Sequence, residues 1–427
     1  MAEAADAMLD VQSGNDRLLL AADAPALSPA TAETGTSAPG LGALTITIHH
    51  SLAEVESDWR TFEREADGTV FQSVDWLACW QRHIGERGEA TPAIVVGRDA
   101  AGAMQFILPL AVQVGRFARE LTWLGSELGD YNAPLLAPGF GERIGRDDFL
   151  SVWRTITERI QSNPHLQFDL IHLTKIPDRV GTQNNPMLNL AVAPHPSGAY
   201  LTHLSGDWDA FYTAKRSSST RRRDRTKRKR LAEIGDIRLF NPEGKAETLQ
   251  TLEMLMTQKA RSFAHMGVGN LFARPGYAEF YRALATDPAT KHLVHVSSLN
   301  VGATVAAINL GLTWRGCYYH LLASYDDGEA SRFGPGAAHL HDLMRWAIEH
   351  DLGVFDFTIG DEPYKRDWCD TEVRLYDLIA GATRRGLFVA AVMAVAARLK
   401  RWIKQTPLLW ALFSKGREAV GSLRRSR

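Results

Sequence analysis

The feature that most constrains the fold is the stretch 331–368, SRFGPGAAHLHDLMRWAIEHDLGVFDFTIGDEPYKRDW. Its apolar side chains recur at the spacing of one helix face, at positions 340, 343, 344, 347 and 348. Gly353 then ends the helix, because glycine takes the left-handed C-cap conformation at little cost. Residues 354–359 have the length and the β-branched and aromatic content of a buried strand. The stretch therefore predicts a loop, a helix and a strand in succession, as in an α/β fold.

Two glycines, Gly334 and Gly336, stand at the start of this helix. Without side chains they let backbone N–H groups approach an anion, and a helix N-terminus adds a partial charge of about half an elementary charge. Pro335 removes one of the donors. The local sequence therefore fits either a pyrophosphate site or an ordinary turn before a helix.

Three strand-like runs separated by turn signals precede the glycines, at residues 293–297, 304–312 and 317–323. A meander followed by a glycine loop, a helix and a strand resembles the acyl-CoA-binding core of the GNAT acetyltransferase superfamily. That pattern has Gln or Arg three residues before the first glycine. Here Ser331 holds that position and Arg332 comes one residue later, so the match is partial.

A closer resemblance rests on CYYHLLASYD (317–326), FGPG (333–336) and FDFTIGDEPYKRDW (355–368). These segments resemble the CelD/BcsL-type acetyltransferases associated with cellulose and exopolysaccharide biosynthesis and, more distantly, the FemAB aminoacyltransferases. The resemblance implies acetyl-CoA or another acyl-CoA as co-substrate, no metal, and a small-molecule or glycan-precursor acceptor. It says little about which acceptor that is.

The order of predicted elements occurs twice along the chain. Residues 44–180 and 200–385 each read as helices and strands in a similar order, and the second half includes a helix expected over 208–234. We therefore expect two tandem GNAT-like domains, the first degenerate, each with a mixed, mostly antiparallel sheet flanked by helices. A disordered arm (1–43), a linker (181–199) and a basic amphipathic helical tail (386–427) complete the chain.

Charge is unevenly distributed. The formal net charge of −1 gives no electrostatic case for a nucleic-acid-binding protein. The run KRSSSTRRRDRTKRKR (215–230) nevertheless holds ten basic residues against Asp224. It fits a solvated helix, a contact with an anionic surface or acceptor, or a nucleic-acid patch, and the absence of aromatic residues within it makes nucleic acid the least favoured.

The tail is also basic. Residues 384–427 hold eleven Lys or Arg and the single acid Glu418. The apolar run 387–397 is shorter than the ~20 residues that cross a bilayer. The tail fits a helix lying on an anionic membrane surface, or one packed on the second domain. Three dispersed cysteines and no recognisable signal peptide favour a cytoplasmic protein, peripheral on the inner face of the membrane if the tail binds lipid.

Acyl transfer needs a held thioester, a proton acceptor and donors to the oxyanion. For the cofactor we expect Gly334, Gly336, Ala337 and Arg332. In the first half the corresponding loop, GDYNAP (129–134), carries an acid and a proline, which make a poor anion site.

For catalysis we predict Asp361 as base or acceptor contact, because it follows the end of a buried strand, and His320 as the next candidate. Tyr325 or Tyr364 would protonate the thiolate, and amides of 317–323 would bind the oxyanion. Acceptor contacts are expected from Tyr364, Lys365, Asp130 and Tyr131. Each also has a structural interpretation, as a strand end, core cap or turn.

The function predicted is acyl transfer from acyl-CoA to an amine or hydroxyl of a sugar, envelope or exopolysaccharide precursor. Two alternatives stay open. One is FemAB-like transfer from aminoacyl-tRNA, with residues 215–230 as the RNA contact. The other is a non-catalytic, membrane-associated scaffold of a polysaccharide synthase.

Overall fold

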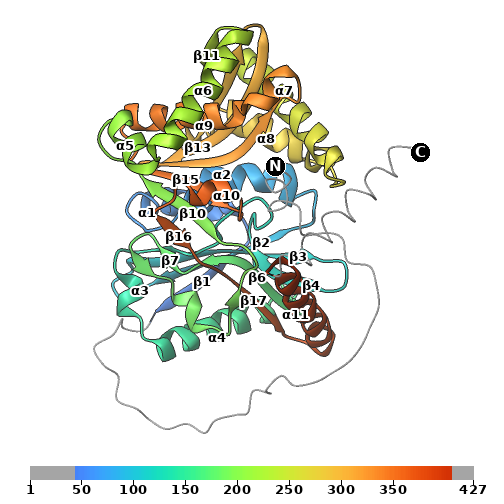
Figure 1. Ribbon diagram of the computed structural model, residues 1–427. Coiled ribbons are helices and arrows are strands. Elements are labelled where there is room, and N and C mark those ends of the chain that lie inside the picture. Colours follow the sequence, from blue (N-terminus) through green and yellow to red (C-terminus); the bar gives the residue numbers. More distant parts are fainter. Residues whose placement is uncertain (1–43, 406–427) are drawn as a thin grey trace, which may run out of the picture.

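The computed structural model describes residues 44–405 and contains two large sheets, one above the other in Figure 1, and a separate two-stranded sheet formed by residues 179–180 and 183–184. The first sheet and its helices use mainly the first half of the chain: β1 (Thr45–His49), α1 (Glu56–Phe62), α2 (Val74–Trp80), β2 (Thr91–Arg98), β3 (Met104–Val114), β4 (Arg119–Trp123), β5 (Leu135–Leu136), α3 (Phe140–Arg143), α4 (Arg146–Ser162), β6 (Leu170–Pro177), β7 (Arg179–Val180), β8 (Gln183–Asn184) and β9 (Ala193–Pro194).

The second sheet and its helices come next in the chain. They are β10 (Ala199–His203), α5 (Trp208–Lys215), α6 (Ser218–Ile234), β11 (Ile237–Phe240), α7 (Lys245–His265), α8 (Tyr277–Thr286), β12 (Val294–Val301), β13 (Thr304–Trp314), β14 (Cys317–Tyr325), α9 (Pro335–Glu349), β15 (Val354–Ile359), α10 (Pro363–Arg366) and β16 (Thr371–Val373). The chain returns to the first sheet with β17 (Leu375–Gly381) and α11 (Arg384–Gln405).

The two sheets repeat one strand order. The first runs β1-β2-β3-β4-β6-β17-β9 with β5 beside β3, and the second runs β11-β12-β13-β14-β15-β10-β16. Neighbouring strands are antiparallel except for one parallel pair in each sheet, β4–β6 and β14–β15. The predicted fold class, two tandem units with mixed, mostly antiparallel sheets, is confirmed.

One strand of each sheet comes from outside the repeated run. β10 precedes the second run and pairs with β15, whereas β17 comes after that run and pairs with β6 of the first sheet. The stretch 375–381, expected in the second domain, therefore lies in the first sheet. The chain thus crosses between the sheets twice after β9, which links the two units.

Helices fill the space between the sheets. α2 packs on α8 of the other unit, and the rings of Trp76 and Phe280 meet edge to face at 5.1 Å. One hydrophobic cluster continues through both units and buries Trp59, Trp76 and Trp80 almost completely. This shared apolar cluster holds the two units together.

Two expectations about helices need correction. The helix expected over 208–234 is two helices, because Ser217 accepts a hydrogen bond from the Thr220 amide (3.2 Å) and caps a new helix. α11 packs on β17 and β6 of the first sheet, not on the second domain, and buries Ala390 there. None of the helices in the described residues is long and apolar enough to cross a membrane. The expected arm 1–43 and the tail beyond 405 lie outside the described residues.

Candidate functional site

The second sheet opens between its two parallel strands. β14 and β15 pair only at Cys317–Val354, Tyr318–Phe355 and Tyr319–Asp356. Beyond these pairs, β14 continues beside β13 while β15 continues beside β10. Backbone groups of β14 after Tyr319 therefore face a gap in the sheet, where we predicted amides that could bind an oxyanion.

The helix after β14 begins with the two glycines. Gly334 takes the left-handed conformation (φ 68°, ψ 58°), which glycine adopts without strain, and Pro335 occupies the first turn of α9. None of the side chains in 44–405 caps the N-terminus of α9. A Cβ atom on Gly336 would have Tyr325 as its nearest neighbour, at 3.7 Å, so the position is open. Tyr325 itself is 44% exposed.

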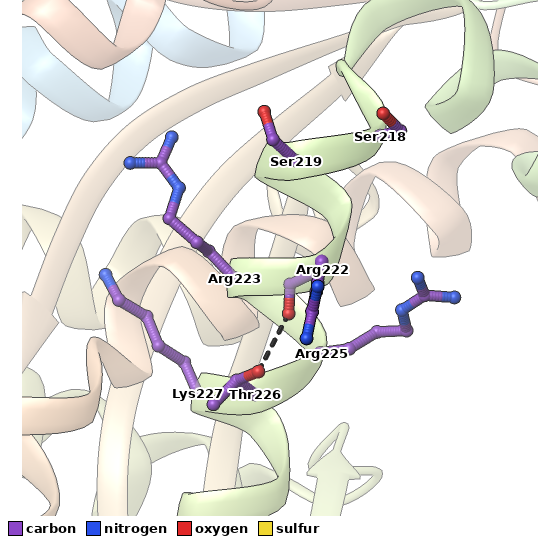
Figure 2. Close-up of a pocket in the computed structure, with 7 residues that line it drawn as sticks. All are labelled: Ser218, Ser219, Arg222, Arg223, Arg225, Thr226 and Lys227. Atoms are coloured by element: carbon purple, nitrogen blue, oxygen red, sulfur yellow. Dashed lines mark hydrogen bonds between the residues drawn. The ribbon is translucent and has the colours of Figure 1, made fainter.

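The basic helix α6 lies beside this helix start. Leu231 of α6 packs in one cluster with Ala338 of α9, and Arg228 pairs with Asp342 of α9 at 3.0 Å. The Lys227 ammonium lies 3.8 Å from the place that a Cβ would take on Gly334. In Figure 2, Arg223 and Lys227 point to one side of α6, while Arg225 points to the other. These three residues line an open pocket together with Ser218, Ser219, Arg222 and Thr226.

A buried ion pair lies just past the end of β15. Glu362 and Lys365 are 5% and 3% exposed, and their charged atoms are 2.9 Å apart. Lys365 also donates to the Ile359 carbonyl at 2.7 Å. Gly360, at φ 131°, allows this approach, because a Cβ there would collide with the Glu362 carboxylate.

Further ionisable groups lie around this ion pair. Burial lowers the pKa of Lys259, on α7, to about 8. The negative charge of Glu362 opposes this shift, and the positive charge of Lys365 adds to it. Burial, with Lys365 and Lys259 nearby, lowers the pKa of His320 to about 3. His320 is therefore neutral at physiological pH and a weak base.

Loop residues of the first unit also contact β15 of the second unit. The Tyr131 hydroxyl donates to Asp356 Oδ1 at 2.8 Å, and the Thr358 amide donates to the same oxygen at 2.7 Å. Burial raises the pKa of Asp356 to about 7, and these two hydrogen bonds oppose the rise. Burial also raises the pKa of Asp130, opposed by Lys175 and by a hydrogen bond from the Thr358 side chain.

Thr358 adopts φ 60°, a conformation that is strained for a β-branched residue. Such strain is held in place by surrounding contacts and is concentrated at functional sites. Here Thr358 contacts Asp130 and Asp356, and its backbone carbonyl lies 3.3 Å from Lys365 Nζ. The strained residue therefore connects the interdomain contact to the buried ion pair.

The predicted residues divide into two groups. His320, Lys365, Asp130 and Tyr131 lie in or beside the opening, whereas Asp361 is exposed and accepts from the Gly198 amide at 3.3 Å. Arg332 pairs with Glu329 at 3.1 Å in the turn before Gly334. Burial raises the pKa of Tyr364, whose ring lies edge to face with Phe357. The roles predicted for these residues stay predictions.

Two residues were missed, Asp356 and Lys259, and a third, Glu362, was available as a base but Asp361 was chosen instead. Asp356 had a signal, since an acid inside a run of buried strand residues is unusual. Glu362 directly succeeds the acid that was chosen, and the sequence does not show which of the two turns inward. Lys259 lies on a long helix and gave no signal. In the described part of the chain, no group of three His, Cys, Asp or Glu residues is placed to hold a metal ion.

A match to a known protein family falls on this part of the chain. The family model for the acetyltransferase (GNAT) domain matches residues 218–366, from the start of α6 to the end of α10. This match covers about a third of the chain and includes the opening, both glycines and the buried ion pair. No curated protein sequence matches.

Solved structures resemble nearly the whole described chain. FemX aligns with a TM-score of 0.52 and 10% identity, over 79% of this chain and 97% of that one. The C-terminal domain of a putative lysylphosphatidylglycerol synthetase from Agrobacterium fabrum gives 0.46 and 10%, over 81% and 98%. A tandem GNAT protein from the clavulanic acid biosynthesis pathway gives 0.45 and 12%, over 80% and 99%. At these identities the likeness to FemX shows a shared fold and nothing about substrates.

Proposed function

We propose that this chain is an acyltransferase that binds acyl-CoA at the opening between β14 and β15, with its pyrophosphate at the start of α9. The observation that carries the proposal is the uncapped start of α9, the first α-helix after β14, the strand that separates from β15. The match of the GNAT domain model to residues 218–366 supports it. Lys227, beside Gly334, would add a positive charge at the same place.

The reaction would join an amine or hydroxyl of the acceptor to the acyl carbon of the thioester. The new bond forms as the carbon–sulfur bond breaks, the acceptor's proton passes to a base, and the departing thiolate takes up a proton. Amides of β14 beyond Tyr319 would stabilise the oxyanion. The acceptor class, a sugar or an envelope or exopolysaccharide precursor, rests on the family resemblance alone.

For the base we now favour Asp356 over Asp361. Asp356 belongs to the last residue pair before the strands separate, and two hydrogen bonds hold one of its carboxylate oxygens. A pKa of about 7 suits proton transfer near neutral pH. Lys259 and Lys365 would counter negative charge that develops nearby. Tyr325, beside Gly336, stays the proposed proton donor to the thiolate.

Transfer from aminoacyl-tRNA is a second candidate, favoured by one observation. The side of α6 that carries Arg222 and Arg225 is exposed, and these two residues have no ion-pair partner among the described residues. Such a face suits a phosphate backbone. RNA binding would fall steeply with salt, whereas acyl-CoA binding at a single site would fall less.

Titration calorimetry with acetyl-CoA tests the proposal. Gly336→Glu puts a carboxylate at the helix start, where the open position accepts a side chain. Gly353→Glu, in the open turn between the end of α9 and β15, is the matched control. We expect wild type and control to bind alike and Gly336→Glu to bind at least about 100-fold more weakly.

All three proteins should give the same circular dichroism spectrum. If neither acetyl-CoA nor longer acyl-CoAs bind to the wild type, the assignment of the α9 start is wrong. Salt-sensitive binding of tRNA without binding of acyl-CoA would favour the second candidate. If no ligand binds, the scaffold alternative remains.

A further inference from the structure

The outer face of α11 is apolar although it faces solvent. Four residues at the spacing of one helix face, Phe388, Val392, Val395 and Leu399, are 71%, 54%, 60% and 52% exposed. The opposite face packs on the first sheet, where Ala390 is buried. α11 is therefore apolar on two sides, and only one side is used for packing.

A second element extends this surface. Phe117 and Val114, at the turn between β3 and β4, are 60% and 58% exposed. The guanidinium of Arg385, near the start of α11, donates to the Phe117 carbonyl at 2.6 Å and holds turn and helix together. With Leu387, these elements hold seven of the eight large hydrophobic side chains that are exposed in the described residues. We call Val114, Phe117, Leu387, Phe388, Val392, Val395 and Leu399 the α11 surface.

Positive charge surrounds the α11 surface. The sequence of α11 holds six Lys or Arg and no acid. Arg384 and Arg398 are exposed, and Arg116, at the turn, lies over the ring of Phe117 at 5.1 Å. Exposed apolar side chains between arginines are the composition of helices that lie in the headgroup region of a bilayer.

We propose that the α11 surface docks on an anionic lipid membrane, with Phe117 and Phe388 inserted among the headgroups and the arginines in contact with lipid phosphates. The charge decides between lipid and a second copy of this chain. In a symmetric dimer through this face, the arginines of one copy would meet those of the other. An anionic membrane satisfies both the apolar side chains and the charge.

The surface lies apart from the candidate active site. In Figure 1, α11 flanks the first sheet at the lower right, whereas α6 and α9 lie in the upper unit. A change on α11 can therefore alter lipid binding without altering acyl-CoA binding. This inference does not depend on the proposed acyltransferase activity.

Vesicle flotation tests the inference with the full chain and two kinds of vesicle, phosphatidylcholine alone and phosphatidylcholine with phosphatidylglycerol. The test variant is Phe388→Asp with Val395→Asp. The matched control is Gln250→Asp with Thr257→Asp, which places the same charges at the same seven-residue spacing on exposed positions of α7. We expect binding to the anionic vesicles only, unchanged in the control and at least about tenfold weaker in the test variant.

A second variant tests the charge. Arg384→Glu with Arg398→Glu should also weaken binding to anionic vesicles, by at least about 30-fold, because two basic residues that each contribute about 1 kcal/mol near such a surface are lost. Equal binding by wild type and the Phe388 and Val395 variant would overturn the proposal. So would wild-type dimers in light scattering that the same variant dissociates, since the face would then belong to a second copy. Absence of vesicle binding by the wild-type chain also overturns it.

Discussion

In the first sheet, β4 and β6 pair in parallel over two residue pairs, and in the second sheet β14 and β15 do so over three. In each pair, the second strand then has one residue in the left-handed region: Lys175 of β6 at φ 57° and Thr358 of β15 at φ 60°. A carboxylate accepts the amide of each, Asp377 for Lys175 at 3.0 Å and Asp356 for Thr358 at 2.7 Å. The two openings are therefore built alike.

They differ in the segment that the chain forms after the first parallel strand. After β14 comes the glycine start of α9. After β4 comes a loop bound to the end of β6: Lys175 Nζ donates to the Gly129 carbonyl at 2.9 Å, and the Asn132 amide donates to the Lys175 carbonyl at 3.0 Å. The loop closes the first opening and extends Tyr131 to Asp356 of the second. The two openings therefore differ in access: the loop 129–132 closes the first, whereas the second is the one at which we propose that acyl-CoA binds.

The largest effect is expected from the two carboxylates. Asp356→Asn should lower turnover by about 10²- to 10⁴-fold, because it removes the proposed base. Asp377→Asn, the matched change in the first sheet, should lower it less than about threefold. The measurement is thiol release from acetyl-CoA in the presence of an amino sugar. Similar losses in both variants would mean that the openings are not functionally distinct.

The unfolding temperature of Asp356→Asn shows whether its lost turnover comes from misfolding. Since the pKa of Asp356 rises from 3.8 to about 7 on folding, the folded state binds more protons between these values and loses stability as the pH rises through them. At pH 8, Asp356→Asn should therefore unfold at the same or a higher temperature than wild type. A lower unfolding temperature would attribute the lost turnover to structure.

A smaller contrast is expected from the two lysines. Lys365→Met leaves the Glu362 carboxylate buried and unpaired, which costs about 3–5 kcal/mol of unfolding free energy. Lys175→Met removes the side-chain donor of the Gly129 carbonyl and one of the two donors of the Ser126 carbonyl, which costs about 1–3 kcal/mol. Urea unfolding measures both values. Only Lys365→Met should weaken acetyl-CoA binding, and weaker binding by Lys175→Met would mean that the ligand reaches the first opening.

The smallest effect tests the contact between the units. The Tyr131 hydrogen bond lowers the pKa of Asp356, so Tyr131→Phe should raise it. With Asp356 as the proposed base, we expect the wild-type rate to fall as the pH drops below about 7, where Asp356 is protonated. In the variant this acid limb should move up by about one pH unit, with turnover at pH 9 nearly unchanged. A profile that does not move would show that Tyr131 only packs the interface.

Local pattern was enough to locate the elements of the site. The strand expected at 354–359 has those limits in the structure, and α9 begins at the predicted glycines. These features depend on residues close together in the sequence, through the spacing of hydrophobic residues, the turn residues and the conformational freedom of glycine. The repeated element order was readable for the same reason. Ser217, which divides the expected long helix, was also readable as a cap.

Tertiary structure decided what sequence order could not. β17 joins the first sheet, and Tyr131 reaches Asp356 across 225 positions, because strand edges and loops find partners by shape and not by distance along the chain. The sequence placed Asp361 and Glu362 side by side, but only the φ of 131° at Gly360 turns Glu362 toward Lys365. The sequence by itself thus determined the repeated α/β units and the glycine start of α9. Which acids are buried, and with what pKa, depends on the desolvation and partners that exist only in the folded chain.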